Sequence, residues 1–244
     1  MVNISLRVRP TIVLFGDSIT QFGFGNSPET QYGWASLLAA AYTRRCDILN
    51  RGFSGYNSRH AVELLPRIFT DDTAVDTLFC TVFFGANDAA VPGEAQHIAI
   101  EEYTENIQKI VTSIRSKAAS PSLPILLITP PPVDEEAWAK ARGTSPVSDR
   151  TNARAKAYGN AAREKLHGHV SVVDAFHLLE GDSSNRAQYL SDGLHLNEKG
   201  NTRLFEGLMA VLRSEHPSIA PLDNEHEATG AGLPVEEKLW RDLC

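Results

Sequence analysis

Residues 11–20 read Thr-Ile-Val-Leu-Phe-Gly-Asp-Ser-Ile-Thr, and this stretch decides the fold. The four apolar residues at 12–15 are uninterrupted, which is typical of a strand buried on both faces of a parallel sheet. The run stops at Gly16, and Ser18 follows two residues later. Because open α/β sheets bind ligands beyond the carboxyl ends of their strands, this hydroxyl is expected at the ligand-binding edge. The simpler interpretation is that Asp17 and Ser18 only close a turn or cap a helix.

Composition narrows the class of protein. The chain has 244 residues, of which 42% are hydrophobic and 22% charged, as expected for one globular domain with a sizeable core. The formal net charge of −7 argues against a nucleic acid or an anionic membrane as partner, since both favour a basic surface. A neutral or weakly charged small molecule is the expected substrate.

The cysteines bear on metal binding, and the apolar runs bear on membrane insertion and secretion. Cys46, Cys80 and Cys244 are few, odd in number and far apart, so they predict neither a disulfide framework nor a zinc site. No apolar stretch approaches the roughly 20 residues of a membrane span. Arg7 and Arg9 are not followed by an apolar core of signal-peptide length. The sequence therefore favours a cytoplasmic protein without a metal.

Strand-length apolar runs alternate with segments of helical periodicity along the chain. The runs are residues 12–15, 47–50, 77–84, 123–129 and 170–174. Helices are expected at 32–45, 58–68, 100–116, 149–167 and from the cap Asn197 to about 213. Residues 133–148 show no regular pattern, and 176–191 are expected to be mostly loop. This alternation predicts an α/β fold in which helices cover both faces of a five-stranded parallel sheet.

The last thirty residues differ from the rest. We expect one domain over residues 1–214 and a polar, acidic tail over residues 215–244. Leu239, Trp240 and Leu243 near the end are apolar. The tail is expected either to be solvated or to dock through this cluster on a partner, including a second copy of the chain in a homodimer.

Residues that can supply a nucleophile, a base or a hydrogen-bond donor follow four of the expected strands. Ser18 follows the first strand, Gly52 the second and Asn87 the third, while Asp192 and His195 come after the fifth. Each has an ordinary explanation alone, such as a turn for Asn87 or a surface position for His195. All five, however, are expected at one edge of one sheet, which indicates a catalytic site.

These residue types suit acyl transfer. A serine hydroxyl is a weak nucleophile at neutral pH, and His195 is the candidate base for Ser18. Asp192 lies three residues earlier, so one turn brings its carboxylate to Nδ1 and leaves Nε2 for the serine. The N–H groups of Ser18 and Gly52 and the amide of Asn87 are the candidate oxyanion donors. Glycine at position 52 would let a substrate approach the backbone closely.

Four ordered segments resemble the GDSL or SGNH hydrolases, a superfamily of serine esterases and lipases. The segments are Gly16–Thr20, Asn50–Gly55, Gly85–Asp88 and Asp192–His195. The resemblance covers residues 11–212 and implies a three-layer α/β/α, flavodoxin-like fold. It also implies that Ser18, Gly52, Asn87 and His195 are the residues for which SGNH hydrolases are named.

Further segments look like the isoamyl acetate-hydrolysing esterases of that superfamily. They are Gln21–Gly23, Asn50–Asn57 and Pro130–Pro132. This resemblance implies hydrolysis of short-chain acetate esters of small alcohols, with no metal or organic cofactor. It also implies a lipophilic pocket, for which the candidate lining residues, unless they serve core or surface packing, are Phe22, Phe53, Trp138 and Leu194.

Other functions remain open at this stage. Related enzymes act as lipases or lysophospholipases, or remove acetyl groups from carbohydrates. A non-catalytic module that binds esters or carbohydrates would use the same scaffold but have a broken triad, and no residue of this triad is missing. An acyltransferase would use the same residues with an alcohol in place of water, and the sequence does not distinguish it from a hydrolase.

Overall fold

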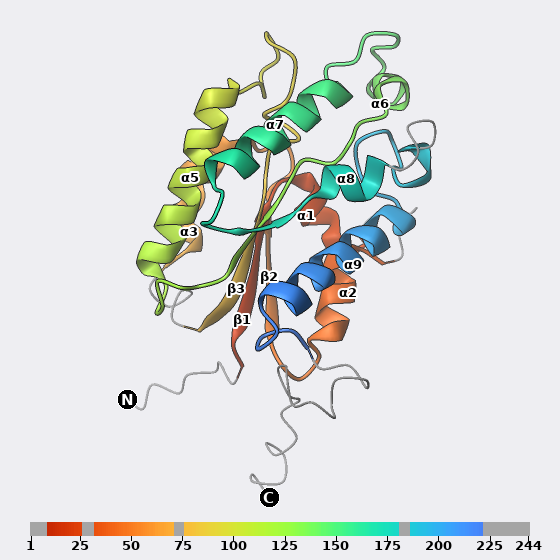
Figure 1. Cartoon of the computed structure of the whole chain (residues 1–244). Coiled ribbons are helices and arrows are strands. Elements are labelled where there is room, and N and C mark those ends of the chain that lie inside the picture. Colours follow the sequence, from red (N-terminus) through yellow and green to blue (C-terminus); the bar gives the residue numbers. More distant parts are fainter. Residues whose placement is uncertain (1–8, 26–31, 71–75, 181–185, 222–244) are drawn as a thin grey trace, which may run out of the picture.

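The fold is built on a single parallel sheet with the strand order β2-β1-β3-β4-β5 (Figure 1). A computed structural model describes residues 9–25, 32–70, 76–180 and 186–221. The strands are β1 (Thr11–Gly16), β2 (Asp47–Gly52), β3 (Thr77–Phe83), β4 (Ile125–Ile128) and β5 (Ser171–Val173). The expected five-stranded parallel sheet is confirmed, although β4 and β5 are shorter than their apolar runs.

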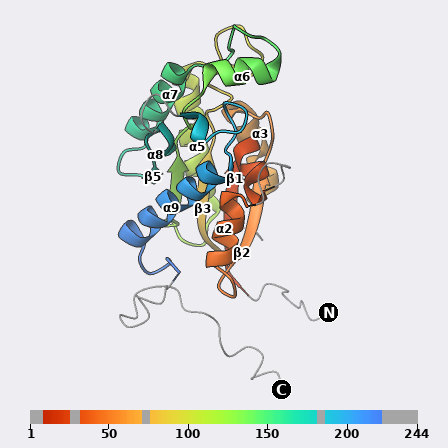
Figure 2. The ribbon, with the colours of Figure 1, turned by 90° about the vertical axis from the view of Figure 1, so that its right-hand side faces the viewer.

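Helices cover both faces of the sheet, which gives three layers (Figures 1 and 2). One face packs against α3 (Ser58–Ile68), α5 (Ile100–Lys117) and α7 (Asn152–Lys165). The other packs against α2 (Trp34–Ala41), α8 (Ala175–Glu180) and α9 (Glu198–Glu215). The short helices α1 (Ser18–Gln21) and α6 (Glu135–Arg142) lie toward the carboxyl ends of the strands. Among the described residues, no helix is both long and apolar enough to cross a bilayer.

Strand β1 explains the decisive apolar run. Ile12 and Leu14 belong to the core beneath α2 and α9, whereas Val13 and Phe15 belong to the core beneath α3 and α5. Successive side chains of a strand point to opposite faces, so a strand covered on both faces needs apolar residues at every position. Ladder partners on both sides, β2 and β3, make β1 an inner strand.

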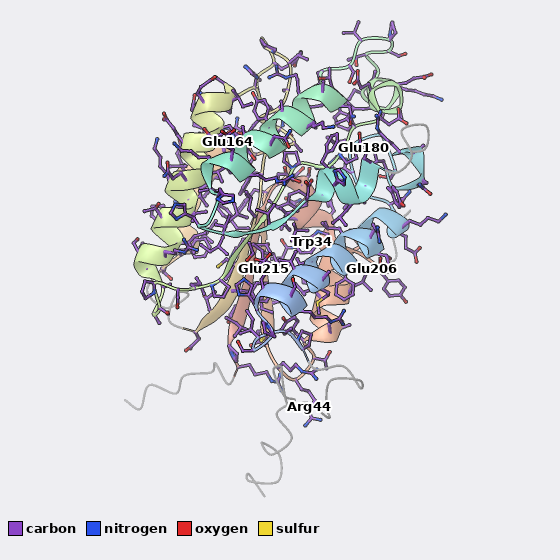
Figure 3. The ribbon with its side chains drawn as sticks, in the orientation of Figure 1. Trp34, Arg44, Glu164, Glu180, Glu206 and Glu215 are labelled. Atoms are coloured by element: carbon purple, nitrogen blue, oxygen red, sulfur yellow. The ribbon has the colours of Figure 1, made fainter. Side chains whose placement is uncertain are left out.

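Trp34, the first residue of α2, connects α1 with α9 through two hydrogen bonds. Its side chain is fully buried, and Figure 3 labels it between α2 and α9. The indole N–H donates to the carbonyl of Ile19 in α1 at 3.2 Å, and the backbone N–H donates to Asn201 Oδ1 in α9 at 3.0 Å. Helices α1 and α2 are thus joined to the distant α9 beside Ser18, the residue that begins α1.

Helix α6 falls in the segment that the sequence analysis left without a pattern. Asp134 caps its amino end by accepting the Ala137 N–H at 3.1 Å, and Gly143 ends it at φ 72°. Acidic residues occupy the first turn and basic residues the last, as the helix dipole favours. The caps were visible in the sequence, but the apolar stripe used to predict helices is missing because only two of the eight residues, Trp138 and Ala139, are buried.

The strand order creates a crevice beside β1. The chain leaves β1 toward β2 on one side, whereas β3 lies on the other, so the connections after β1 and β3 diverge. Open α/β sheets bind their ligands at such a point. The domain boundary at residue 214 stays a prediction, although α9 ends at Glu215, close to that position. The expected contact of Leu239, Trp240 and Leu243 lies outside the described residues.

Gly52 has a different role from the one expected. A Cβ built at this position would lie 2.0 Å from the backbone nitrogen of Gln21 and 2.6 Å from the carbonyl carbon of Thr20. Glycine is therefore required because the end of β2 packs directly against the backbone of α1, and not because a substrate approaches there.

We expect Gly52→Ala to lower the free energy of unfolding by about 1–3 kcal/mol, because the added methyl forces two backbone segments apart. Urea denaturation of both proteins measures this change. Gly207→Ala in α9 is the control, since the added methyl meets the side chain of Leu178, which can rotate away. Unchanged stability of Gly52→Ala would contradict the packing role.

Candidate active site

The chain turns sharply after β1 to present Ser18. Asp17 is the N-cap of α1, and its carboxylate accepts the Ile19 N–H at 2.9 Å. Ser18 is therefore the first residue of the helix, and its backbone N–H has no partner within the helix. The side chain is 6% exposed. Asp17 thus caps the helix, as the simpler interpretation of this stretch holds, and Ser18 occupies the position directly after the cap.

Ser18, His195 and Asp192 form a hydrogen-bonded chain. Ser18 Oγ lies 2.9 Å from His195 Nε2, and His195 Nδ1 lies 2.7 Å from Asp192 Oδ2. The other carboxylate oxygen of Asp192 accepts the N–H groups of Leu194 and His195 at 2.9 and 2.8 Å. The structure thus brings together the three residues expected to act as nucleophile, base and acid, in the expected order.

The carboxylate of Asp192 is kept ionised. Burial by itself raises the pKa of this carboxyl, but the hydrogen bonds from the His195 ring and from two backbone N–H groups lower it, and the lowering prevails. A charged Asp192 accepts a hydrogen bond from the N–H at Nδ1 of His195. This bond fixes the imidazole tautomer that leaves Nε2 unprotonated and facing the serine.

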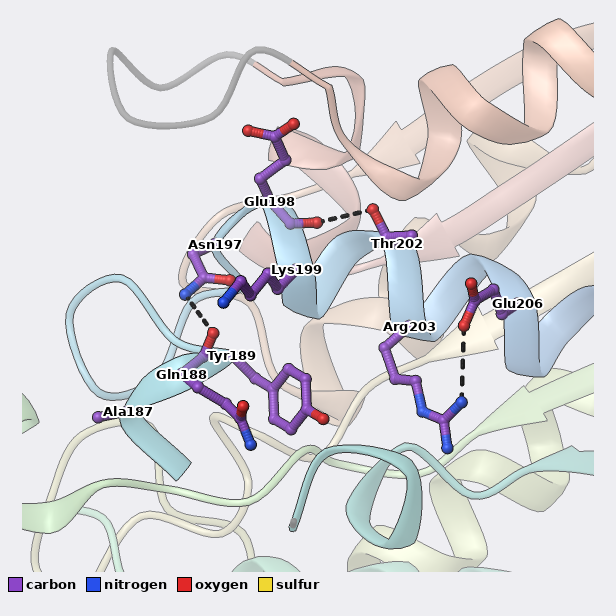
Figure 4. Close-up of a pocket in the computed structure, with 9 residues that line it drawn as sticks. All are labelled: Ala187, Gln188, Tyr189, Asn197, Glu198, Lys199, Thr202, Arg203 and Glu206. Carbon is purple, nitrogen blue, oxygen red and sulfur yellow. Dashed lines mark hydrogen bonds and ion pairs between the residues drawn. The ribbon is translucent and has the colours of Figure 1, made fainter. Parts of the chain in front are cut away.

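The turn that carries Asp192 and His195 is held from both of its ends. Leu190 and Leu196 form an antiparallel bridge below it, and the Ser191 N–H donates to the His195 carbonyl at 2.8 Å. Asn197 caps α9 and also donates through Nδ2 to the carbonyl of Gln188 at 2.9 Å (Figure 4). The surface hollow drawn there, of about 760 Å³, is lined by none of the candidate catalytic residues, so we assign no substrate to it.

Asn87 is oriented by contacts on both ends of its amide. Nδ2 donates to the carbonyl of Tyr56 at 2.9 Å, and Oδ1 accepts from Arg150 Nη2 at 3.4 Å. The side chain is 5% exposed. An amide nitrogen carries two hydrogens, so the second one remains to be donated to a ligand.

The N–H of Gly52 is already used. It donates to Asn50 Oδ1 at 2.8 Å, so the expected role of Gly52 as an oxyanion donor is revised. Three residues later, Gly55 adopts φ +81° and its N–H has no acceptor among the described residues. Gly55 immediately precedes Tyr56, whose carbonyl holds Asn87. The sequence shows that Gly55 is a second glycine in the segment Asn50–Gly55. It does not show that the N–H of Gly52 is bonded to Asn50, which is why Gly52 was chosen.

Aromatic side chains flank His195. The rings of Phe22 and Trp138 each lie 5.9 Å from the imidazole, in edge-on contacts. Phe22 is 38% exposed, whereas Phe53 is half-buried and stacks on Tyr56. Leu194 is only 3% exposed and belongs to the core beneath α2 and α9, in agreement with the core-packing alternative stated for it.

Trp138 is held in place beside His195 by hydrogen bonds and close packing. The Asp134 N–H at the start of α6 donates to the carbonyl of Gly193 at 2.9 Å. Gly193 has φ +97°, and a Cβ there would lie 2.4 Å from the Trp138 backbone nitrogen. The indole N–H of Trp138 donates to Asp149 Oδ1 at 2.6 Å. Helix α6 is thus packed directly on the turn that carries Asp192 and His195.

The fold is that of a three-layer α/β protein, and a hydrogen-bonded chain of serine, histidine and aspartate is typical of serine hydrolases. A sequence profile of the GDSL-like Lipase/Acylhydrolase family matches residues 14–203. The chain therefore belongs to the GDSL-like lipase/acylhydrolase family, and it is a carboxylic ester hydrolase of that superfamily.

Several named proteins are similar to this chain over most of their length. The mouse isoamyl acetate-hydrolyzing esterase 1 homolog is 40% identical over 86% of this chain and 84% of its own. The human homolog of the same name is 40% identical over 96% of this chain and 88% of its own. A GDSL esterase/lipase of Arabidopsis thaliana is 38% identical over 91% of this chain and 93% of its own.

Solved structures confirm the expected fold. A lipase/acylhydrolase from Enterococcus faecalis aligns with a TM-score of 0.65 and 23% identity, over 88% of this chain and 99% of its own. The acetylxylan esterase Axe2 from Geobacillus stearothermophilus aligns with a TM-score of 0.63 and 18% identity, over 84% of this chain and 95% of its own.

A buried carboxyl lies directly beside the serine. Asp17 is 1% exposed, and its Oδ2 makes no hydrogen bond with the described residues. Burial raises the pKa of this carboxyl to about 7, even though the Ile19 N–H lowers it. Among the neighbouring charges, His195 and Arg150 lower this pKa and Asp88 raises it. Asp88 is itself fully buried, and burial raises its pKa to about 6.

We expect Asp17→Asn to stabilise the protein increasingly as pH rises from about 4 to about 7. In that range the folded state holds a proton on Asp17 that the unfolded state releases, so ionisation favours unfolding. The gain reaches at most about 4 kcal/mol, since each pKa unit corresponds to about 1.4 kcal/mol.

Urea denaturation at several pH values measures this difference, with Asp47→Asn at the exposed start of β2 as the control for the lost charge. A stability difference between Asp17→Asn and wild type that does not change with pH would contradict the raised pKa.

Proposed function

We propose that the protein hydrolyses short-chain, acetate-type esters of small alcohols through an acyl-enzyme on Ser18. The observation that carries the proposal is the unbroken chain of hydrogen bonds from Ser18 Oγ through His195 to Asp192, at 2.9 and 2.7 Å. The substrate class is supported by relatives that are about 40% identical and are named isoamyl acetate-hydrolyzing esterase 1 homologs.

The reaction proceeds in two halves. Ser18 Oγ attacks the ester carbonyl while His195 Nε2 accepts its proton, and the tetrahedral intermediate collapses when Nε2 returns that proton to the leaving alcohol. A water molecule then attacks the acyl-enzyme, with His195 again accepting and returning the proton. Asp192 stabilises the imidazolium that forms in each half.

Three donors are assigned to the developing oxyanion. They are the backbone N–H of Ser18, the backbone N–H of Gly55 and the second amide hydrogen of Asn87. Donors that are held in place before the reaction stabilise the transition state because no reorganisation is needed when charge develops. Gly55 replaces Gly52 in this set because the N–H of Gly52 is bonded to Asn50.

The walls around His195 favour a small apolar group. Phe22 and Trp138 present aromatic edges to the imidazole, and α6 is anchored on the catalytic turn. Aromatic surface beside the base suits the hydrocarbon part of a small alcohol. Location in the cytoplasm and assembly as a homodimer stay predictions.

We expect hydrolysis of p-nitrophenyl esters to be fastest with acetate and to decline toward decanoate, because the proposed substrates carry a short acyl group. Ser18→Ala should lose nearly all activity with every ester while keeping the fold, since it removes the nucleophile. A maximum with long chains would move the assignment to a lipase or lysophospholipase, and an unchanged rate in Ser18→Ala would contradict the mechanism.

We expect Asn87→Ala to lower kcat by about 10²–10³-fold, the usual loss when one oxyanion donor is removed. Asn106→Ala is the matched control, because Asn106 is also 5% exposed but donates to Ser58 Oγ, away from the catalytic chain. Comparable kcat values for the two variants would remove Asn87 from the oxyanion site.

A further inference from the structure

Arg150 lies at the centre of the contacts that hold the proposed oxyanion donors. We propose that it is a positioning residue, which fixes the side chain of Asn87 directly and the backbone of Gly55 through Gln96. This inference rests on the proposed function, since it concerns donors assigned there. Nothing in the sequence around Arg150 indicates a role for it.

The contact with Asn87 sets the direction of the amide. Arg150 Nη2 lies 3.4 Å from Asn87 Oδ1, and its Nε donates to the carbonyl of Ala86, the preceding residue, at 2.9 Å. A guanidinium offers only donors, so it donates to the oxygen of the amide and disfavours the NH2 group at that place. Nδ2 is therefore turned toward the carbonyl of Tyr56 and toward the ligand.

The contact with Gln96 reaches the second donor. Arg150 Nη2 also donates to Gln96 Oε1, and Gln96 Nε2 donates to the carbonyl of Gly55 at 2.8 Å. Gly55 adopts φ +81°, and nothing but Gln96 Nε2, at 3.5 Å, lies within 4 Å of where its Cβ would be. The bond from Gln96 therefore restrains the carbonyl of Gly55, and the N–H of the same peptide, that of Tyr56, donates to the Phe53 carbonyl at 3.1 Å. One guanidinium group thus holds two loops, the one after β2 and the one after β3.

Burial makes the arrangement rigid. Arg150 is 2% exposed, and its charge is compensated by Asp149, whose Oδ2 lies 2.9 Å from Nη1. Burial lowers the pKa of the guanidinium from its usual value, although Asp149 raises it. Asp149 Oδ1 also accepts the indole N–H of Trp138, which flanks His195. The same ion pair therefore connects the oxyanion side of the site with the wall behind the base.

The position of Arg150 in the chain supports a functional explanation. It directly precedes Thr151, the N-cap of α7, where a positive charge opposes the helix dipole. A lysine would carry the same charge but only one compact ammonium, which cannot reproduce separate bonds from Nε, Nη1 and Nη2. These contacts therefore depend on the geometry of the guanidinium more than on its charge.

The test compares Arg150→Lys with Arg154→Lys in p-nitrophenyl acetate hydrolysis. Arg154 is a matched control because it lies one turn further along, and its Nε donates to Ala89 in the same loop at 2.9 Å without reaching Asn87 or Gln96. We expect Arg150→Lys to lower kcat at least about tenfold with KM changed less than about threefold, because donors are misplaced mainly in the transition state. Arg154→Lys should change kcat less than about twofold.

A double-mutant cycle separates positioning from general destabilisation. In an Asn87→Ala background the substitution Arg150→Lys should lower kcat by no more than about threefold, because the main group it positions is gone. A loss of full size in that background would overturn the inference, as would equal effects of Arg150→Lys and Arg154→Lys.

If Arg150→Lys does not fold, Gln96→Met is measured in its place. We expect this variant to lower kcat several-fold at unchanged KM. An unchanged kcat would overturn the inference. Wild-type activity that depends on Ser18 and Asn87 but not on Arg150 or Gln96 overturns this inference alone. Activity that is independent of Ser18 overturns the proposed function as well.

Discussion

The site depends on one hydrogen bond, between Ser18 Oγ and His195 Nε2, which joins residues 177 positions apart in the chain. Neither residue lies within a long element, since Ser18 begins a four-residue helix and His195 lies in a turn. Their separation is set by what lies behind them: β1 between two ladders, and Trp34 tying α1 to α9. The rigid layers of the fold thus determine a distance on which proton transfer depends.

The site is assembled at a cost to stability. Asp17 and Asp88 are buried with pKa values raised by desolvation, and Arg150 is a buried cation. Buried charges of this kind rarely stabilise a fold compared with apolar residues of similar size. Their contacts lie around the site: Asp17 caps α1, Asp88 accepts the Ser58 N–H at the start of α3, and Arg150 contacts the amide of Asn87. Functional sites commonly trade stability for such contacts.

Much of the fold and of the hydrogen-bonded chain was predictable because both follow local rules. The apolar run of β1 requires burial on both faces, and the three-residue spacing from Asp192 to His195 allows one turn to join them. Gly52 was misassigned because its role comes from the approach of α1, a contact that only the packed structure defines. The core position of Leu194 likewise follows from tertiary packing, which the sequence of the turn does not show. Arg150 was missed because its partners, Asn87 and Gln96, are 63 and 54 positions away.

The central claim is that Ser18 is the nucleophile. The most direct measurement is the reaction of the protein with a small organophosphate such as diethyl p-nitrophenyl phosphate, followed by intact mass and peptide mapping. The account predicts one diethylphosphoryl group per chain, located on the peptide that contains Ser18, with hydrolytic activity lost in proportion to labelling. A label on another residue, or full labelling with activity retained, would contradict it.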